Sequence, residues 1–185
     1  MSFTKFLASK HQACKELVEK LSLSYEYVSL LGTHVTGTNV MVSSHEKRVS
    51  DSREGQCGFV VKLYNGKHYS EYSFNEFDVD NIDSLVETIK NSTKICDTLE
   101  NDVVKTKVLD DTPLTKTYCR PVEGKIPSVN EVFTQLEAMR DKAHAYSDKI
   151  IHVNLVYEIN DFSKMFISKN RDLCQNYSWT TLAFI

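Results

Sequence analysis

Two β-prone runs, residues 56–64 and 67–74, are separated only by the pair Asn65-Gly66, and this arrangement constrains the fold more than any other local feature. An Asn-Gly pair between such runs is typical of a tight β-hairpin, because a type I′ turn needs positive φ at both central positions. We therefore predict an antiparallel hairpin over residues 56–74, with Asn65 and Gly66 at its turn.

The residues before this hairpin also favour strands. β-prone runs occupy residues 25–31, which end at Gly32, and residues 35–42, and a polar run follows at residues 48–53. Short runs bounded by turn residues are typical of antiparallel sheets. Together with the hairpin they predict an antiparallel meander of about four strands.

Three segments have the three- and four-residue apolar spacing of amphipathic helices. We predict that the first helix begins at the N-cap Ser2 and ends near Ser22, and that Asp80 caps the second. The third begins at Ser128, which is placed to form a capping box with Glu131. The apolar stripes comprise Phe3, Phe6, Leu7, Cys14, Leu17, Val18 and Leu21 in the first; Ile82, Leu85, Val86, Ile89 and Cys96 in the second; and Val132, Phe133, Leu136 and Ala143 in the third.

Strand-like residues return after the third helix, at 150–159, 162–168 and 173–185, with a turn expected at 169–172. The alternation of helices with antiparallel strand pairs predicts an α+β fold, in which three main helices pack on an antiparallel or mixed β-sheet.

This order divides the chain into two α+β halves, residues 1–100 and 128–185. The connecting segment, residues 101–127, has little periodicity, and the three prolines of the chain lie within it or at its edge. The chain ends on the apolar, strand-like run 179–185, whereas natural termini are usually polar and frayed. We therefore expect that the sheet is truncated at this point and that a longer parent chain continues.

The charge balance limits the partners. With 22 basic and 25 acidic residues the net charge is −3, which excludes a general polyanion binder and predicts no nucleic-acid partner. No N-terminal leader pattern and no apolar run of about 20 residues is present, so no membrane partner is expected. The five cysteines are scattered without metal or redox spacing and predict reduced thiols in a cytoplasmic protein.

No complete catalytic or cofactor motif is present. His45-Glu46 begins like a zinc metalloprotease helix, but Val49 and Ser50 stand where the second histidine is needed. The six histidines have no ligand spacing and are expected to be surface or packing residues. We accordingly assign no catalytic, cofactor-binding or metal-ligating residue from sequence.

Three weaker patterns also have ordinary explanations. An RNA-stacking strand over residues 58–64 would need a basic residue where Cys57 stands and an aromatic residue where Val61 stands. Gly66-Lys67 lacks the flanking residues of a phosphate-binding loop. The acidic groups at residues 76–80 and 110–111 are read as solvated loops or helix caps.

Several stretches nevertheless resemble the N-terminal region of the TldD/PmbA family, metallopeptidases once called modulators of DNA gyrase. The matching stretches are SYEYV at residues 24–28, VSDSREGQCGFVV at 49–61, NGK at 65–67, YSF at 72–74 and the strand pair around residues 164–179. The resemblance covers most of the chain, although Lys62 stands where family strands often carry arginine.

The resemblance implies a zinc peptidase whose metal site, a His-Glu-x-x-x-His helix and a later cysteine, lies in the C-terminal half of the parent. It therefore implies no cofactor in this chain and zinc in the C-terminal domain of the parent. This chain would be a non-catalytic N-terminal domain that contributes to a homodimer, or to a heterodimer with a related subunit. It would also wall the chamber that admits an extended peptide substrate for proteolysis or peptide maturation.

Two alternatives remain open from the sequence. One is a stand-alone protein- or peptide-interaction module that accepts a strand at a sheet edge. The other is a small enzyme with a dispersed site, in which Cys57 or Cys174 is activated by a histidine from elsewhere in the chain. Whether this chain is itself an enzyme is therefore not decided by its sequence.

Overall fold

The computed structural model describes residues 3–52, 55–94, 109, 111–120 and 122–185, and these residues form an α+β fold with three helices and a seven-stranded mixed sheet. The elements in chain order are α1 (Lys5–Leu21), β1 (Tyr27–Ser43), β2 (Lys47–Asp51), β3 (Gln56–Tyr64), β4 (Tyr69–Phe74), α2 (Ile82–Thr93), β5 (Leu114–Cys119), α3 (Val129–Tyr146), β6 (Asn154–Ser168) and β7 (Arg171–Phe184). The strand order is β4-β3-β1-β6-β7-β5, and β2 pairs with β1 beside β3. The predicted fold class is confirmed.

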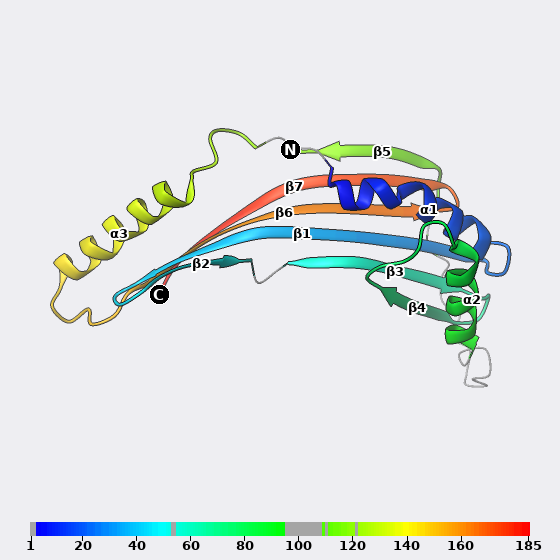
Figure 1. Ribbon diagram of the computed structural model, residues 1–185, viewed down its shortest axis with the longest axis horizontal. Helices are drawn as coiled ribbons and strands as arrows, with labels where there is room; N and C mark the ends of the chain where they lie inside the picture. Colours follow the sequence, from blue (N-terminus) through cyan, green and yellow to red (C-terminus); the bar gives the residue numbers. More distant parts are fainter. Residues whose placement is uncertain (1–2, 53–54, 95–108, 110, 121) are drawn as a thin grey trace.

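The centre of the sheet joins strands from distant parts of the chain. β1 pairs antiparallel with β6 from Ser29, opposite Ser168, to Ser43, opposite Asn154, without a break in register. β7 then pairs antiparallel along almost the whole of β6. These three long strands form the curved ribbon in Figure 1, with α1 and α2 near one end and α3 near the other.

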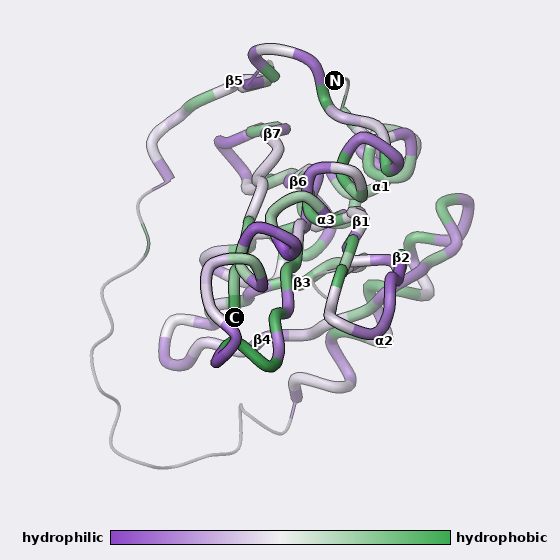
Figure 2. The backbone as a smooth tube through the Cα atoms, turned by 90° about the vertical axis from the view of Figure 1, so that its left-hand side faces the viewer, coloured by the Kyte–Doolittle hydropathy of each residue, from purple (hydrophilic) through white to green (hydrophobic). Residues whose placement is uncertain are grey.

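All three helices pack on one face of the sheet, in two separate clusters. Leu30 of β1 lies in the cluster beneath α1 and α2, and Val42 lies in the cluster beneath α3. The two residues are twelve apart in an unbroken strand, and this even spacing places them on the same face. Figure 2 views the molecule from the end at which α3 lies, with the backbone coloured by hydropathy.

Two pairs of predicted strands are each one continuous strand. Residues 25–31 and 35–42 were expected to be separated at Gly32, yet Gly32 lies inside β1. A Cβ at this position would lie 3.0 Å from both Leu7 and Phe59, so the glycine allows α1 to approach the sheet closely rather than ending a strand. The expected break between residues 150–159 and 162–168 is likewise absent, because β6 runs through it.

The predicted hairpin is confirmed, but its turn is different. β3 and β4 pair from Tyr64, opposite Tyr69, so the loop has four residues rather than two. Gly66 has φ +91°, whereas no residue other than glycine has positive φ in the described chain. Asn65 acts through its side chain instead, because its Oδ1 accepts hydrogen bonds from the backbone N–H groups of Lys67 (3.0 Å) and His68 (2.8 Å).

The helix ends were predicted to within a few residues. Thr4 rather than Ser2 caps α1, and Ser2 itself lies outside the described residues. Asn81 rather than Asp80 caps α2, because the Asn81 side chain accepts from the N–H of Ser84. The second helix ends at Thr93, and Cys96 lies outside the described residues.

The predicted capping box of α3 is present. Ser128 Oγ accepts from the N–H of Glu131 at 3.3 Å, and the Glu131 carboxylate accepts from the N–H of Ser128 at 2.7 Å. The ion pair with Lys125 and these hydrogen bonds with Ser128 lower the pKa of Glu131. Val132 and Leu136 of the predicted stripe are buried.

Replacing Ser128 with alanine is expected to lower the free energy of unfolding by about 1 kcal/mol, because the first turn of α3 loses a side-chain acceptor. Urea unfolding followed by circular dichroism measures the change. Ser128→Thr keeps the hydroxyl and serves as the control. Equal losses in both variants would contradict a role for the cap.

One strand was not predicted. β5 lies within the connecting segment 101–127 and pairs in parallel with the first part of β7, from Leu114 opposite Arg171 to Cys119 opposite Asn176. Its residues are all exposed, so it has no apolar alternation by which sequence could identify it.

Candidate functional site

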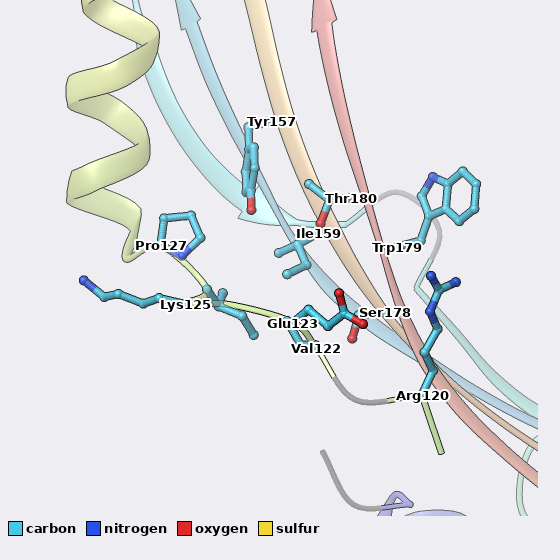
Figure 3. Close-up of a pocket in the computed structure, with 11 residues that line it drawn as sticks. Arg120, Val122, Glu123, Lys125, Pro127, Tyr157, Ile159, Ser178, Trp179 and Thr180 are labelled. Carbon is cyan, nitrogen blue, oxygen red and sulfur yellow. The ribbon is translucent and has the colours of Figure 1, made fainter. Parts of the chain in front are cut away.

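A cleft of about 480 Å³ lies on the helix-bearing face beside the cluster beneath α3, against which Tyr157 of its lining packs. Tyr157 and Ile159 of β6 and Thr180 of β7 form part of its floor, and the segment 122–127 faces them (Figure 3). Lys125 of this segment is held by Glu131 at 2.6 Å, which ties the wall of the cleft to the first turn of α3. The complete lining is Arg120, Val122, Glu123, Lys125, Ile126, Pro127, Tyr157, Ile159, Ser178, Trp179 and Thr180.

At this cleft β7 becomes an edge strand of the sheet, because β5 ends there. β5 pairs with it only as far as Asn176, and the last contact is a hydrogen bond of 2.9 Å from the N–H of Arg120 to the Asn176 carbonyl. The backbone N–H and C=O groups of Asn176 therefore point away from β6. The same groups of Thr180, Leu182 and Phe184 also point away from β6, because the direction alternates from one strand residue to the next. β6 pairs with this part of β7 on the inner side, but on the outer side no strand of the described residues pairs with it beyond Asn176.

The outer part of β7 is also apolar. Trp179 is 60% exposed, Phe184 is 61% exposed and Leu182 is 54% exposed. Phe184 pairs with Leu155, which is fully buried beneath α3, so α3 covers one residue of this pair and leaves the other in solvent. We refer to Thr180, Leu182 and Phe184, with the neighbouring Trp179, as the β7 edge. An exposed apolar edge of this kind is a template for pairing with another strand.

A second cluster joins α1 to the start of β7. The Nε2 atom of His11 lies 2.8 Å from Oδ1 of Asp172, and the Lys15 ammonium lies 3.0 Å from Oδ2 of the same carboxylate. Cys174 lies on the same face of β7 two residues further on, and one donor atom from each of His11, Asp172 and Cys174 lies within 4.8 Å of the others. Burial favours a raised pKa for Asp172, but the hydrogen bonds from His11 and Lys15 outweigh it and lower the pKa.

The two candidate nucleophiles of the sequence are not activated thiols. Partial desolvation raises the pKa of the largely exposed Cys57, and the carboxylate of Glu76 adds to the effect. Burial also raises the pKa of Cys174, with further contributions from Asp172 and Cys119. A catalytic thiol needs a lowered pKa, so the proximity of His11 to Cys174 does not produce the environment that nucleophilic catalysis requires.

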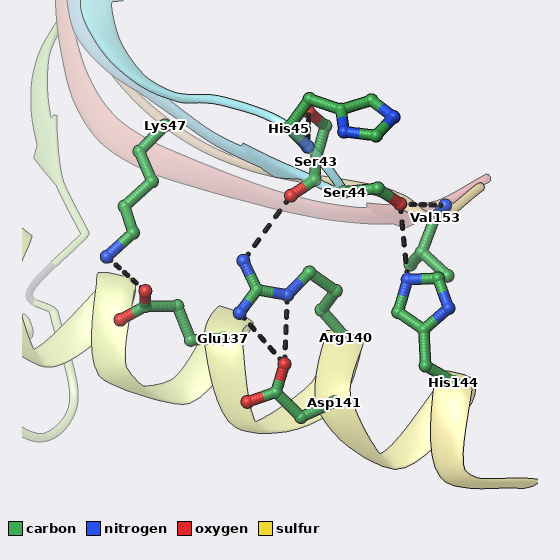
Figure 4. A network of polar contacts seen from close by, with 9 residues as sticks. All are labelled: Ser43, Ser44, His45, Lys47, Glu137, Arg140, Asp141, His144 and Val153. Carbon is green, nitrogen blue, oxygen red and sulfur yellow. Dashed lines mark hydrogen bonds and ion pairs between the residues drawn. The ribbon is translucent and has the colours of Figure 1, made fainter. Parts of the chain in front are cut away.

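The pair His45-Glu46 lies in the turn between β1 and β2 rather than on a helix, so it has no metalloprotease geometry. The adjacent residues instead anchor α3 to the sheet (Figure 4). Ser44 Oγ accepts from the N–H of Val153 at 3.1 Å and donates to Nε2 of His144 at 3.2 Å. This direction follows because Nδ1 of His144 donates to the carbonyl of Ile150 at 3.0 Å.

Two further contacts complete this anchor. Arg140 donates to the carbonyl of Ser43 at 3.4 Å and also pairs with Asp141, and Lys47 forms an ion pair with Glu137. His144 and Ser44 are therefore structural residues at the end of the sheet.

The face of the sheet opposite the three described helices, which we call the helix-free face, carries a hollow of about 600 Å³. Tyr27, Leu31, Val60 and Phe166 give it an apolar floor. Its rim carries charged side chains, because Lys62 and Glu71 form an ion pair there at 2.8 Å. Arg171 and Leu109 also line the hollow. This mixture of apolar and charged groups suits an extended peptide better than a small molecule held on all sides.

Sequence reasoning missed both the β7 edge and the cluster of His11, Asp172 and Cys174. The apolar run 179–185 was noticed, but its exposure depends on where β5 ends. His11 and Asp172 are 161 residues apart, so only the folded chain brings them together.

Among the helices of the described chain, none is long and apolar enough to cross a membrane.

No protein-family model matches the sequence, and no curated protein matches it significantly. Its fold does occur among solved structures, including the following three. A proposed modulator of DNA gyrase from Bacteroides thetaiotaomicron superposes with a TM-score of 0.70 at 14% identity, over 95% of this chain and 40% of the other. A proposed modulator of a DNA gyrase from Thermotoga maritima superposes with a TM-score of 0.53 at 12% identity, over 90% of this chain and 38% of the other. TldE from Thermococcus kodakarensis superposes with a TM-score of 0.55 at 10% identity, over 93% of this chain and 39% of the other.

These neighbours agree with the resemblance to the TldD/PmbA family, and at this level of identity they establish the fold. This chain spans about 40% of the length of the structures it matches.

Proposed function

We propose that this chain acts as the non-catalytic N-terminal domain of a cytoplasmic TldD/PmbA-like zinc metallopeptidase, which functions in proteolysis or peptide maturation. The observation that carries the proposal is the extent of the structural match, which takes in nearly all of this chain and less than half of each neighbour. The sequence has no His-Glu-x-x-x-His motif, so the catalytic zinc would be bound by the C-terminal domain of the parent.

The domain would contribute to dimerisation through the β7 edge. Thr180, Leu182 and Phe184 offer backbone N–H and C=O groups to a strand from a second subunit, either a second copy or a related chain. Burying Leu182 and Phe184 in that contact would add a hydrophobic contribution of about 1.5 to 3 kcal/mol for each side chain. Dimer formation would thereby cover the apolar surface that the isolated chain leaves in solvent.

The helix-free face would serve as wall of the peptide chamber. Its hollow presents Leu31, Val60 and Phe166 beside the Lys62–Glu71 ion pair, and both apolar and charged side chains of a passing peptide would find partners there. This role requires the face to remain open, and the helices of the described residues all lie on the opposite side.

The alternative function is a stand-alone module that binds a peptide strand at the same edge. It is favoured by the cleft beside β7, because a peptide that pairs with Thr180 would lie against the segment 122–127. The two functions differ in the occupant of the edge, which is a second subunit in the first and a free peptide in the second.

The substitution Thr180→Pro tests the role of the edge. Proline removes the outward N–H of residue 180 and leaves the β6–β7 hydrogen bonds intact, because the edge side of a strand tolerates proline. Light scattering after size exclusion is expected to give a dimer for the unmodified 21.2 kDa chain and a monomer for Thr180→Pro. Thr180→Ala keeps the N–H and is expected to remain dimeric.

Three results would count against the proposal. A monomeric unmodified chain that binds extended peptides would favour the stand-alone module. A Thr180→Pro variant that dimerises normally would place the dimer contact elsewhere. Peptide hydrolysis by the purified chain would show that the chain is catalytic by itself.

A further inference from the structure

Three side chains of types that can bind a metal ion converge where α1 lies against the start of β7. His11 projects from the helix, and Asp172 and Cys174 occupy alternate positions of the strand, so both strand side chains point toward the helix. Their donor atoms lie within 4.8 Å of one another. We infer that His11, Asp172 and Cys174 form a zinc-binding site that joins α1 to the sheet.

The spacing needs only small side-chain movements to accept the ion. Zinc binds histidine nitrogen and carboxylate oxygen at about 2.0 to 2.2 Å and thiolate sulfur at about 2.3 Å, so its ligand atoms lie roughly 3 to 4 Å apart. His11 Nε2 and Asp172 Oδ1 are already 2.8 Å apart. These two atoms move apart and Cys174 moves closer when the ion enters, and water fills the fourth position.

The donor set selects the type of metal. A nitrogen, a carboxylate oxygen and a sulfur suit zinc and its spectroscopic substitute cobalt, whereas magnesium and calcium prefer oxygen ligands alone. The His11 side chain is 30% exposed and the Asp172 side chain 18% exposed, so an ion can reach them from solvent. On binding, zinc replaces the proton of the Cys174 thiol, which passes to the solvent.

The effect of removing the Lys15 charge distinguishes a metal site from a simple ion-pair cluster. The Lys15 ammonium holds Oδ2 of Asp172 at 3.0 Å while Oδ1 faces His11, so it occupies the oxygen that the metal does not need. As a cation beside the site, Lys15 repels a divalent ion. Removing its charge should therefore strengthen metal binding, although it removes a stabilising contact from the metal-free protein.

This inference is independent of the proposed peptidase function, because it concerns a joint between α1 and β7 and assigns no reaction to the metal. It also departs from the expectation, drawn from sequence and family resemblance, that this chain holds no cofactor. The histidine and the two strand residues lack motif spacing because they come from opposite ends of the chain.

Cobalt titration of the reduced full chain tests the site. We expect one equivalent to bind with a cobalt–thiolate charge-transfer band in the near ultraviolet, and zinc to displace it. Cys174→Ser should lose the band, and His11→Gln and Asp172→Asn should each weaken binding about tenfold or more. Cys57→Ser, which removes an exposed thiol elsewhere, should leave band and affinity unchanged. Lys15→Gln should bind cobalt several-fold more tightly.

Zinc should also raise the melting temperature of the unmodified chain and leave that of Cys174→Ser unchanged, because only a bound ligand stabilises the folded state. Circular dichroism checks that each variant is folded. Absence of the thiolate band in the unmodified chain, or its persistence in Cys174→Ser, would overturn the site. Weaker or unchanged binding in Lys15→Gln would place the metal away from Asp172 and would overturn the assignment as well.

Discussion

Replacing Phe59 with alanine is expected to lower the free energy of unfolding by about 4 kcal/mol, because the change leaves a cavity at the centre of the larger core. Phe59 is 2% exposed, and its ring centroid lies 5.7 Å from that of Phe6, 5.4 Å from that of Phe74 and 5.4 Å from that of Phe77. The residue therefore connects α1, β4 and the loop before α2 to the sheet. Urea unfolding followed by far-ultraviolet circular dichroism measures the loss.

Leu23→Ala is the control for the Phe59 variant. Leu23 is a large apolar residue with 87% exposure, so its truncation should change the free energy of unfolding by no more than about 0.5 kcal/mol. A loss below about 1.5 kcal/mol for Phe59→Ala would mean that the aromatic cluster does not hold the helices on the sheet.

Replacing Gly37 with alanine is expected to cost about 3 kcal/mol, an unusually large effect for one added methyl group. Gly37 lies opposite Asn160 in the β1–β6 register, and a Cβ there would overlap the Ile159 carbonyl oxygen and Oδ1 of Asn160. Ser52 closes the remaining side, with its Cβ at 2.9 Å and its N–H bonded to the Gly37 carbonyl at 3.0 Å. Because backbone atoms cannot move aside as a flexible side chain can, the long β1–β6 pairing must distort.

Gly55→Ala is the matched control for this substitution. The nearest atom to a Cβ at position 55 is the carbonyl oxygen of Ser52 at 3.4 Å, which is ordinary contact, so the free energy of unfolding should stay within about 0.5 kcal/mol. Equivalent stability in the Gly37 and Gly55 variants, measured by the same urea titration, would contradict the close approach of β1 to β6.

The parts of the fold that local chemistry determines were predictable from sequence. The hairpin over residues 56–74 and the capping box at Ser128 each depend on residues within a few positions of one another, and both are present. The interpretation of Gly32 was wrong because its role depends on a helix packed above the strand, which no local pattern reveals. β5 was missed because its partner, β7, is supplied by a segment more than a helix away in sequence.

The candidate sites were less predictable than the fold. Sequence identified the apolar run 179–185, but the length of β5 decides which of its residues have a strand on their outer side among the described residues. The sequence also suggested that Cys174 lies beside a histidine from elsewhere in the chain, and His11 does lie beside Cys174. The predicted chemistry was nucleophilic, whereas the environment raises the pKa of the thiol and brings a carboxylate to the same place.

The register of β1 has a consequence for synthesis on the ribosome. Its central partner, β6, lies roughly 110 to 140 positions further along the chain, and at about 5 to 20 residues per second it emerges roughly 6 to 28 seconds after β1. During that interval β1 can pair with β2 and β3, but its other side has no native neighbour. Until β6 is synthesised, we expect a chaperone that binds unpaired strand edges to protect β1. The yield of folded protein in cells should therefore depend on how fast translation reaches codon 168.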